Sequence, residues 1–187
     1  TVWSKWASSD SASEKVAAKA AAGDTLALFF AGHGFRSPKG AFYLTNTHFR
    51  PSDPKGTGLS SPDLAAALTR VRARVVLFID ACHAGSAGEE MFGSNENAIT
   101  SLRSSGAGPI VVFAAAKGRQ HSRESKTSGY FTLALSRALT VDKKRYDANH
   151  NGLIEASELY LALKENVMTQ TQGEQTPWFA RLDYVGD

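Results

Sequence analysis

Two short segments of the chain end on side chains that could carry out nucleophilic catalysis. TLALFFAGHG contains His33, and RVVLFIDACHAG contains Cys82, the only cysteine among the 187 residues. A free thiol has a pKa of about 8.5 and is only a few per cent thiolate at neutral pH, so an adjacent imidazole is its usual activator. These residue types therefore predict a nucleophilic Cys82 with His33 as the general acid–base.

Each of the two residues also has an ordinary structural interpretation. A lone cysteine is most often a small buried apolar residue, and a single histidine after a strand is no more specific. Both residues, however, follow strand-like segments with glycine nearby, and His33 lies between Gly32 and Gly34. Glycine lets a substrate approach the backbone, and N–H groups in such turns can bind a developing oxyanion. The two segments together therefore favour catalysis.

Three apolar runs would position these side chains. They cover residues 25–31, 74–81 and 109–116, and none alternates polar with apolar residues. Such runs are typical of strands that are buried on both faces of a parallel sheet. Ligands of open α/β sheets bind beyond the carboxyl ends of the strands. If the first two strands are neighbours, about 4.8 Å apart, His33 and Cys82 would face one crevice.

Helices are predicted between and after these strands, which makes the fold a layered α/β domain. The predicted helices are rich in apolar residues. One begins at Ser61, and the others cover 10–22, 130–140 and 156–168. Ser61 would be an N-cap, with Pro62 in the first helical position. Residues 41–44 could form a short hairpin.

The composition limits what else the chain could do. Hydrophobic residues make up 42% and charged residues 21%, which is ordinary for a globular domain of this length. No apolar run approaches the roughly 20 residues of a membrane-spanning helix. The formal charge is only +3 and no basic stripe alternates with aromatics, so nucleic-acid binding is not expected. A single cysteine can form neither an internal disulfide nor a thiolate metal site.

The two motifs together resemble those of the caspase–metacaspase superfamily of cysteine peptidases. The histidine of FFAGHG lies 49 residues before the cysteine of IDACHAG, close to the spacing of about 50 in the caspase signature. The similarity continues through FYL, TGLSSPDL, VVFAAAKGRQHSRES, GYFTLAL and QTPWF, and so covers most of the chain. It implies a caspase-like three-layer α/β sandwich with a mostly parallel central sheet. It also implies an oxyanion hole formed by the N–H groups of Gly34 and Cys82.

Asp80, two residues before the cysteine, resembles the Asp-x-Cys motif of bacterial metacaspase-like peptidases, whereas caspases have Gln-Ala-Cys. In metacaspases this acid lies at the base of the primary specificity pocket. It implies protein or peptide substrates with Arg or Lys before the cleaved bond, since hydrogen bonds to charged groups are strong. Alternatively, Asp80 only orients its loop by accepting backbone N–H groups. Ser122 and Glu124 belong to a segment that lines the substrate cleft in this family.

Several other polar residues have less specific assignments. Basic residues in the two polar loops are either solvated or, as the resemblance implies, sites of self-processing; they are Arg103, Lys117, Arg119, Arg123 and Lys126. His83, which directly follows the cysteine, is expected to be structural, and His121 has no specific assignment. The second acid that often follows the FYL segment in the family is not evident, and Asp53 is a candidate for it.

Residues 147–158, DANHNGLIEASE, match the calcium loop of an EF-hand. The candidate ligands supply oxygen atoms and are Asp147, Asn149, Asn151, the carbonyl of Leu153, and Glu158. We predict Ca²⁺ as a structural or regulatory ligand, whereas no cofactor is expected for the chemistry. Because two of the first three ligands are neutral Asn, the alternative is a helix-connecting loop that keeps this shape without the ion.

The chain departs from the family ahead of the strand that ends in His33. The family's sheet has further strands there, but the stretch before residue 25 is too short for a strand–helix–strand unit. We therefore expect the first one or two strands to be missing and a separate N-terminal fragment to complete the sheet, with a short version of the fold as the alternative. The rival function is a catalytically silent signalling or scaffold module that binds calcium or a regulatory protein. The intact His33 and Cys82 argue against it.

Overall fold

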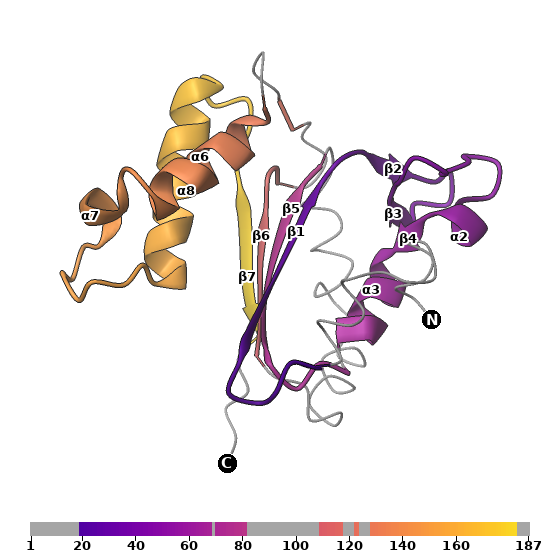
Figure 1. Cartoon of the computed structure of the whole chain (residues 1–187). Coiled ribbons are helices and arrows are strands. Elements are labelled where there is room, and N and C mark those ends of the chain that lie inside the picture. The colour runs from indigo at the N-terminus through magenta and orange to yellow at the C-terminus, as the bar shows by residue number, and fades with distance from the viewer. Residues whose placement is uncertain (1–18, 69, 82–108, 118–121, 124–127, 183–187) are drawn as a thin grey trace.

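The computed structural model describes residues 19–68, 70–81, 109–117, 122–123 and 128–182 (Figure 1). A four-stranded sheet lies at its centre, in the order β1-β5-β6-β7. Its strands are β1 (Thr25–Ala31), β5 (Arg74–Asp80), β6 (Ile110–Ala114) and β7 (Trp178–Leu182). β1, β5 and β6 run parallel, and β7 pairs with β6 antiparallel. The three predicted strands and the mostly parallel sheet are therefore confirmed. The prediction that all three are buried on both faces is wrong for β1, which ends the described sheet: Leu26 and Phe30 are buried, but Phe29 is 50% exposed.

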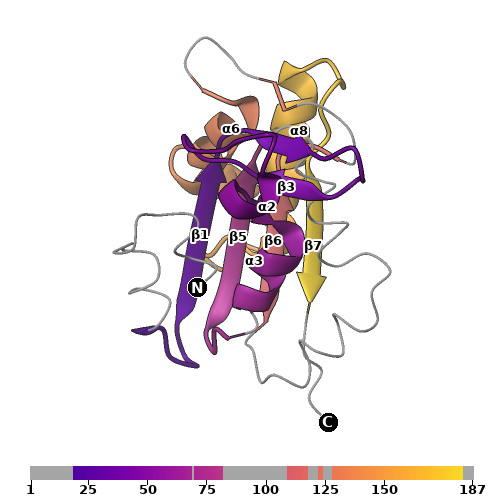
Figure 2. The same cartoon turned by 90° about the vertical axis from the view of Figure 1, so that its right-hand side faces the viewer.

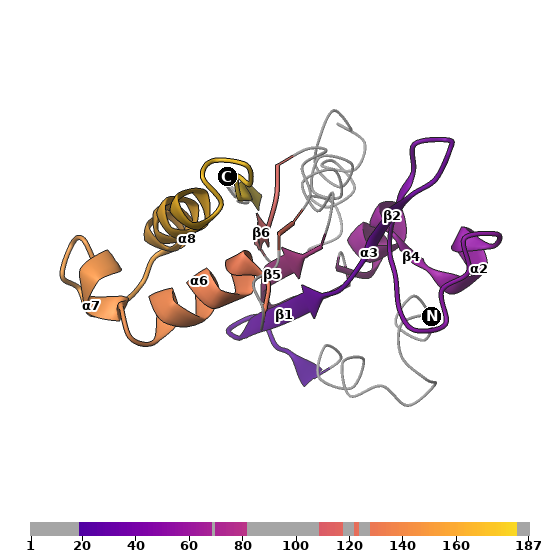
Figure 3. The same ribbon diagram turned by 90° about the horizontal axis from the view of Figure 1, so that it is seen from above.

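β5 lies inside the sheet and has apolar side chains on both faces. Val75, Leu77 and Ile79 belong to one buried cluster, and Phe78 belongs to a second cluster on the opposite face. This burial explains why the run RVVLFID does not alternate polar with apolar residues. Figures 1 and 3 show elements packed on both sides of the sheet, which gives the predicted three-layer α/β sandwich.

The layer on the Phe78 side consists of α6 (Tyr130–Leu139), α7 (Lys143–Tyr146) and α8 (Ala156–Gln170). α6 and α8 each present a stripe of buried apolar residues at helical spacing toward the sheet, which are Phe131, Ala134, Leu135, Ala138, Leu159, Ala162, Leu163 and Val167. The helices predicted over 130–140 and 156–168 are therefore confirmed.

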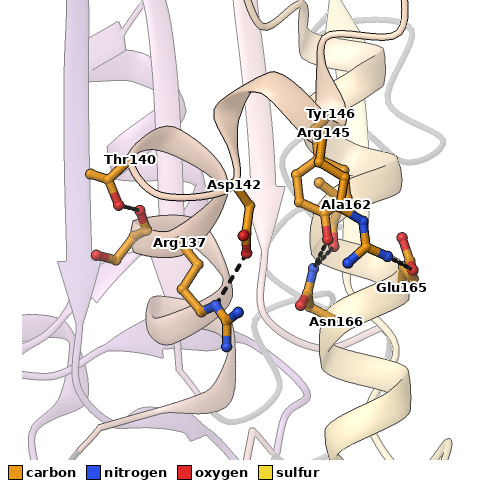
Figure 4. Close-up of polar contacts among 9 residues, drawn as sticks. Arg137, Thr140, Asp142, Arg145, Tyr146, Ala162, Glu165 and Asn166 are labelled. Carbon is orange, nitrogen blue, oxygen red and sulfur yellow. Dashed lines mark hydrogen bonds and ion pairs between the residues drawn. The ribbon is translucent and has the colours of Figure 1, made fainter.

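Polar contacts join the three helices of this layer (Figure 4). Arg145 Nη2 lies 2.7 Å from Glu165 Oε1, and Asn166 Nδ2 donates to the Tyr146 hydroxyl at 2.6 Å. Arg137 Nε lies 3.2 Å from Asp142 Oδ2, just after α6. The Arg145–Glu165 pair is exposed, so it contributes little stability, about 0–1 kcal/mol, and the apolar stripes hold the layer.

The opposite layer contains α3 (Ser61–Leu68) and a small antiparallel sheet, with the short α2 (Pro54–Thr57) beside it. The small sheet has the order β2-β3-β4, from Gly34–Arg36, Phe42–Leu44 and Leu59–Ser60. Figure 2 shows α3 and this sheet in front of the central strands. The predicted hairpin at 41–44 is confirmed as β3, which pairs with β2.

The start of α3 corrects one prediction. Ser60, not Ser61, is the cap: its Oγ accepts the Asp63 N–H at 3.2 Å and donates to the Asp63 carboxylate at 2.8 Å. Ser61 is the first helical residue and is buried, and its hydroxyl has no hydrogen-bond partner within the described part of the chain.

The predicted helix over 10–22 lies mostly outside the described residues, and of its described part only Lys19 is helical. None of the helices described in the structure is long and apolar enough to cross a membrane.

Candidate active site

The carboxyl ends of β1 and β5 lie side by side. The two strands are parallel neighbours in which Ala31 pairs with Asp80, and the Gly32 N–H donates to the Asp80 carbonyl at 3.0 Å. His33 follows Ala31 by two residues, and Cys82 follows Asp80 by the same number. Cys82 itself lies outside the described residues, which reach the buried Ala81 at this strand end.

His33 lies on an exposed turn whose backbone is fixed on both sides. Its carbonyl accepts the Thr45 N–H at 3.0 Å and the Thr45 hydroxyl at 2.9 Å. Gly34 then pairs with Leu44 in the small sheet. In an antiparallel ladder these bonds make Gly34 and Leu44 a non-hydrogen-bonded pair, whose N–H groups point away from the partner strand. The Gly34 N–H is therefore not used by β3 and can donate to another acceptor.

A hollow of about 530 Å³ lies next to His33 and is lined by residues 29–33 and 45–47. The Phe30 ring packs directly against Gly32, so a Cβ built on Gly32 would lie only 2.8 Å from Phe30 Cζ. The glycine before His33 therefore makes room for a core aromatic ring. Space beside the imidazole remains open to solvent.

Asp80 is buried on the sheet face that packs against α6. It is 8% exposed, and its Oδ1 accepts the Ser122 hydroxyl at 2.7 Å. Its Oδ2 accepts both the N–H and the hydroxyl of Thr132, in the first turn of α6. Gly129 approaches the same oxygen so closely that a Cβ there would collide with it. Asp80 therefore connects the end of β5 to α6 and to the segment that contains Ser122.

Arg123, the next residue, is held by Gln175, a residue that no sequence motif singled out. Gln175 is fully buried, and its Oε1 accepts the Arg123 N–H at 2.7 Å while its Nε2 donates to the Ala115 carbonyl at 2.7 Å. The Arg123 guanidinium pairs with Glu174. The chain between β6 and α6 is thus anchored at Ser122 to the end of β5 and at Arg123 to the segment between α8 and β7.

Two further residues given a role from the sequence, Asp53 and Lys117, are not part of this arrangement. Asp53 caps α2, where its carboxylate accepts the Gly56 N–H at 3.0 Å, and Lys117 is exposed. The other residues given a role from the sequence lie outside the described residues; they are Glu124, His83, His121, Arg103, Arg119 and Lys126.

The loop at 147–158 uses its candidate ligands to hold its own turns. Asp147 is 8% exposed, and its two carboxylate oxygens accept the N–H groups of Asn151 at 3.0 Å and Gly152 at 2.8 Å. Asn151 Oδ1 accepts the Leu153 N–H at 2.8 Å, and Glu158 Oε1 accepts the Ala148 N–H at 2.9 Å.

These ligand-position oxygens are hard donors of the kind Ca²⁺ takes. Each Asp147 carboxylate oxygen accepts one N–H and keeps a second lone pair, whereas Glu158 Oε1 accepts two, from Ala148 and Asn149. Gly152 has φ +80, the conformation that the turn glycine of such a loop adopts. Among the described residues, no group of three or more His, Cys, Asp or Glu side chains is arranged to hold a metal. The oxygen donors of the loop nevertheless fit calcium in their chemistry, and two of the candidate ligands are neutral amides.

Comparisons with known proteins add to this geometry. The family described as Caspase domain, a family of cysteine peptidases, matches residues 5–184. The crystal structure of protein GSU0716 from Geobacter sulfurreducens is similar to this chain, with a TM-score of 0.53 and 20% sequence identity. The similarity covers 94% of this chain and 72% of that protein, and at this identity it shows the fold alone. None of the curated proteins matches this chain.

Proposed function

Since the chain belongs to the caspase-domain family of cysteine peptidases, we propose that it is an endopeptidase with Cys82 as nucleophile and His33 as general acid–base. The register of β1 and β5 carries this proposal. Ala31 and Asp80 are paired, and the two predicted catalytic residues follow them at equal distances along the chain. Because paired strands lie about 4.8 Å apart, we expect an imidazole and a thiol at these positions to reach one substrate bond.

In the proposed mechanism, His33 takes the proton of the Cys82 thiol, and the Cys82 Sγ thiolate attacks the carbonyl carbon of the scissile bond. The oxyanion that forms accepts hydrogen bonds from the N–H groups of Gly34 and Cys82, and the Gly34 N–H, which points away from β3, supports this role. His33 then protonates the leaving amine, and the C–N bond breaks to leave a thioester. Water, deprotonated by His33, hydrolyses the thioester and releases the acid product and the free thiol.

We propose that Asp80 selects substrates with Arg or Lys before the cleaved bond. Its buried carboxylate lies on the same sheet face as Ala31, the neighbouring residue at the end of β1. A hydrogen bond to a charged group contributes about 1.5–3 kcal/mol, which corresponds to a preference of roughly 10- to 150-fold. Ser122 and Glu124 would form a further part of the substrate cleft.

Self-processing after basic residues follows from the same specificity. Arg123 is a poor site for it, since its N–H, carbonyl and guanidinium are held by Gln175, Tyr130 and Glu174. Cleavage would instead fall among the other basic loop residues, which are Arg103, Lys117, Arg119 and Lys126. For the loop at 147–158 we propose that Asp147, Asn149, Asn151, Leu153 and Glu158 would hold Ca²⁺ in a structural or regulatory role.

Fluorogenic peptides that differ only in the residue before the cleaved bond test the function. Peptides with Arg or Lys should be cleaved, and the matching Asp peptide should not. The Cys82→Ala variant should lose all cleavage, including self-processing, and keep the melting temperature of the wild type. Turnover of the Asp peptide in preference to the basic ones would reject the specificity, and full activity in Cys82→Ala would reject the nucleophile.

A further inference from the structure

We propose that Thr132 is a positioning residue that limits how Asp80 can bind a basic side chain, so that the enzyme accepts Lys about as well as Arg. The inference rests on the proposed function, because it concerns the same specificity site. It starts from the way in which donors are distributed over the two oxygens of Asp80.

A carboxylate has about four acceptor positions, two on each oxygen. Thr132 occupies both positions on Oδ2, one through its N–H at 3.2 Å and one through its hydroxyl. Oδ1 accepts the Ser122 hydroxyl, which is its one hydrogen bond among the described residues. Within this part of the chain, Oδ1 therefore has an acceptor position to offer a ligand, and Oδ2 has none.

The fold prevents the carboxylate from turning to present its oxygens differently. The N-cap of α6 is Gly129, which has no side chain to satisfy the first N–H groups of the helix. Asp80 performs this function from a strand 52 residues away, and its negative charge is favourable at the N-terminal end of the helix. Gly129 also packs against Oδ2 with no space for a Cβ.

This arrangement affects Arg and Lys differently. A guanidinium gains most from a carboxylate when two parallel N–H groups reach both oxygens. With Oδ2 occupied, Arg can make one such bond to Oδ1. A Lys ammonium is a compact charge that needs only one oxygen, so its binding to Oδ1 is not weakened by the occupation of Oδ2. The usual advantage of Arg is therefore removed by one hydroxyl group.

The test measures kcat/KM for two peptides that differ only in Arg or Lys before the cleaved bond. For the wild type we expect the two values to agree within about threefold. Thr132→Ala keeps the N–H, removes the hydroxyl and leaves space beside Oδ2, and should raise the Arg:Lys ratio about tenfold because Oδ2 becomes available for a second bond. Thr132→Gly should raise it similarly and provides a second variant, since it too keeps the N–H and opens this space.

Two variants serve as controls. Thr132→Ser restores the hydroxyl and should return the ratio to that of the wild type. Ser122→Ala removes the donor on Oδ1 and leaves Oδ2 occupied, so the ratio should stay unchanged even if both rates fall. An unchanged ratio in folded Thr132→Ala and Thr132→Gly, with both peptides still cleaved, overturns this inference alone. Failure of the wild type to cleave either peptide overturns it together with the proposed function.

Discussion

The atoms around the Asp80 carboxylate are closely packed. The Asp80 carboxylate is nearly enclosed, and Gly129 lies against its Oδ2. Gly129 has φ −60 and ψ 141, a conformation that any residue adopts, so glycine is required here by space and not by the backbone. The same carboxylate caps α6 and is proposed to select the substrate, which means that a disturbance at Gly129 should affect stability and activity together.

We therefore predict that Gly129→Ala lowers the free energy of unfolding by about 1–3 kcal/mol, the usual cost of an overpacked site. It should also lower kcat/KM for basic peptides, because Asp80 must move. Gly23→Ala is the matched control, since a Cβ there would meet nothing within 4 Å. Urea denaturation should show a change of less than about 0.5 kcal/mol for Gly23→Ala. Equal effects of the two substitutions would contradict the account of Gly129.

At the scale of elements, the sequence indicated those that contain a continuous apolar run or an apolar stripe at helical spacing. The runs that became β1, β5 and β6 were recognisable for this reason, and so were α6 and α8. β7 was missed, because Trp178–Leu182 mixes apolar and charged residues and is ordered by pairing with β6. β4, with two residues, and α2, with four, are too short to leave a pattern.

The site was predictable only in part, for a related physical reason. The positions of His33 and Asp80 follow from the strands that precede them, and the motif itself is local. Their supporting contacts are not: Thr132 lies 52 residues from Asp80, and Gln175 lies 60 residues from Ala115. Contacts over such separations depend on how the layers pack, and no local pattern of residue types specifies them.

Calcium binding tests the role of the loop at 147–158, which leads into α8. With two neutral ligands we expect a weak site, with a Kd of about 10⁻⁴–10⁻³ M. Calcium at about 10 mM should therefore raise the melting temperature by a few degrees. Glu158→Gln should abolish this shift, and magnesium should not reproduce it. No shift of the wild type at millimolar calcium would contradict the prediction and favour a loop that keeps its shape through the hydrogen bonds of Asp147 and Asn151.

For the whole molecule, the three layers meet at the edge of the sheet where β1 and β5 end. The small sheet holds the carbonyl of His33 through Thr45 on one side. On the other side, α6 holds the carboxylate of Asp80 through Thr132. The predicted acid–base and the predicted specificity residue are thus supported by different layers, so the geometry of the site depends on the packing of both layers on the central sheet.

The central claim is that the His33 imidazole activates the Cys82 thiol, and the single cysteine makes this directly measurable. The rate of alkylation by iodoacetamide at about pH 6.5 can be followed by mass spectrometry for the wild type, His33→Ala and His48→Ala. His48 is exposed and serves as the control. We predict that the wild type and His48→Ala react at the same rate, at least about tenfold faster than His33→Ala, because the imidazole increases the thiolate fraction. Equal rates in all three proteins would contradict the claim.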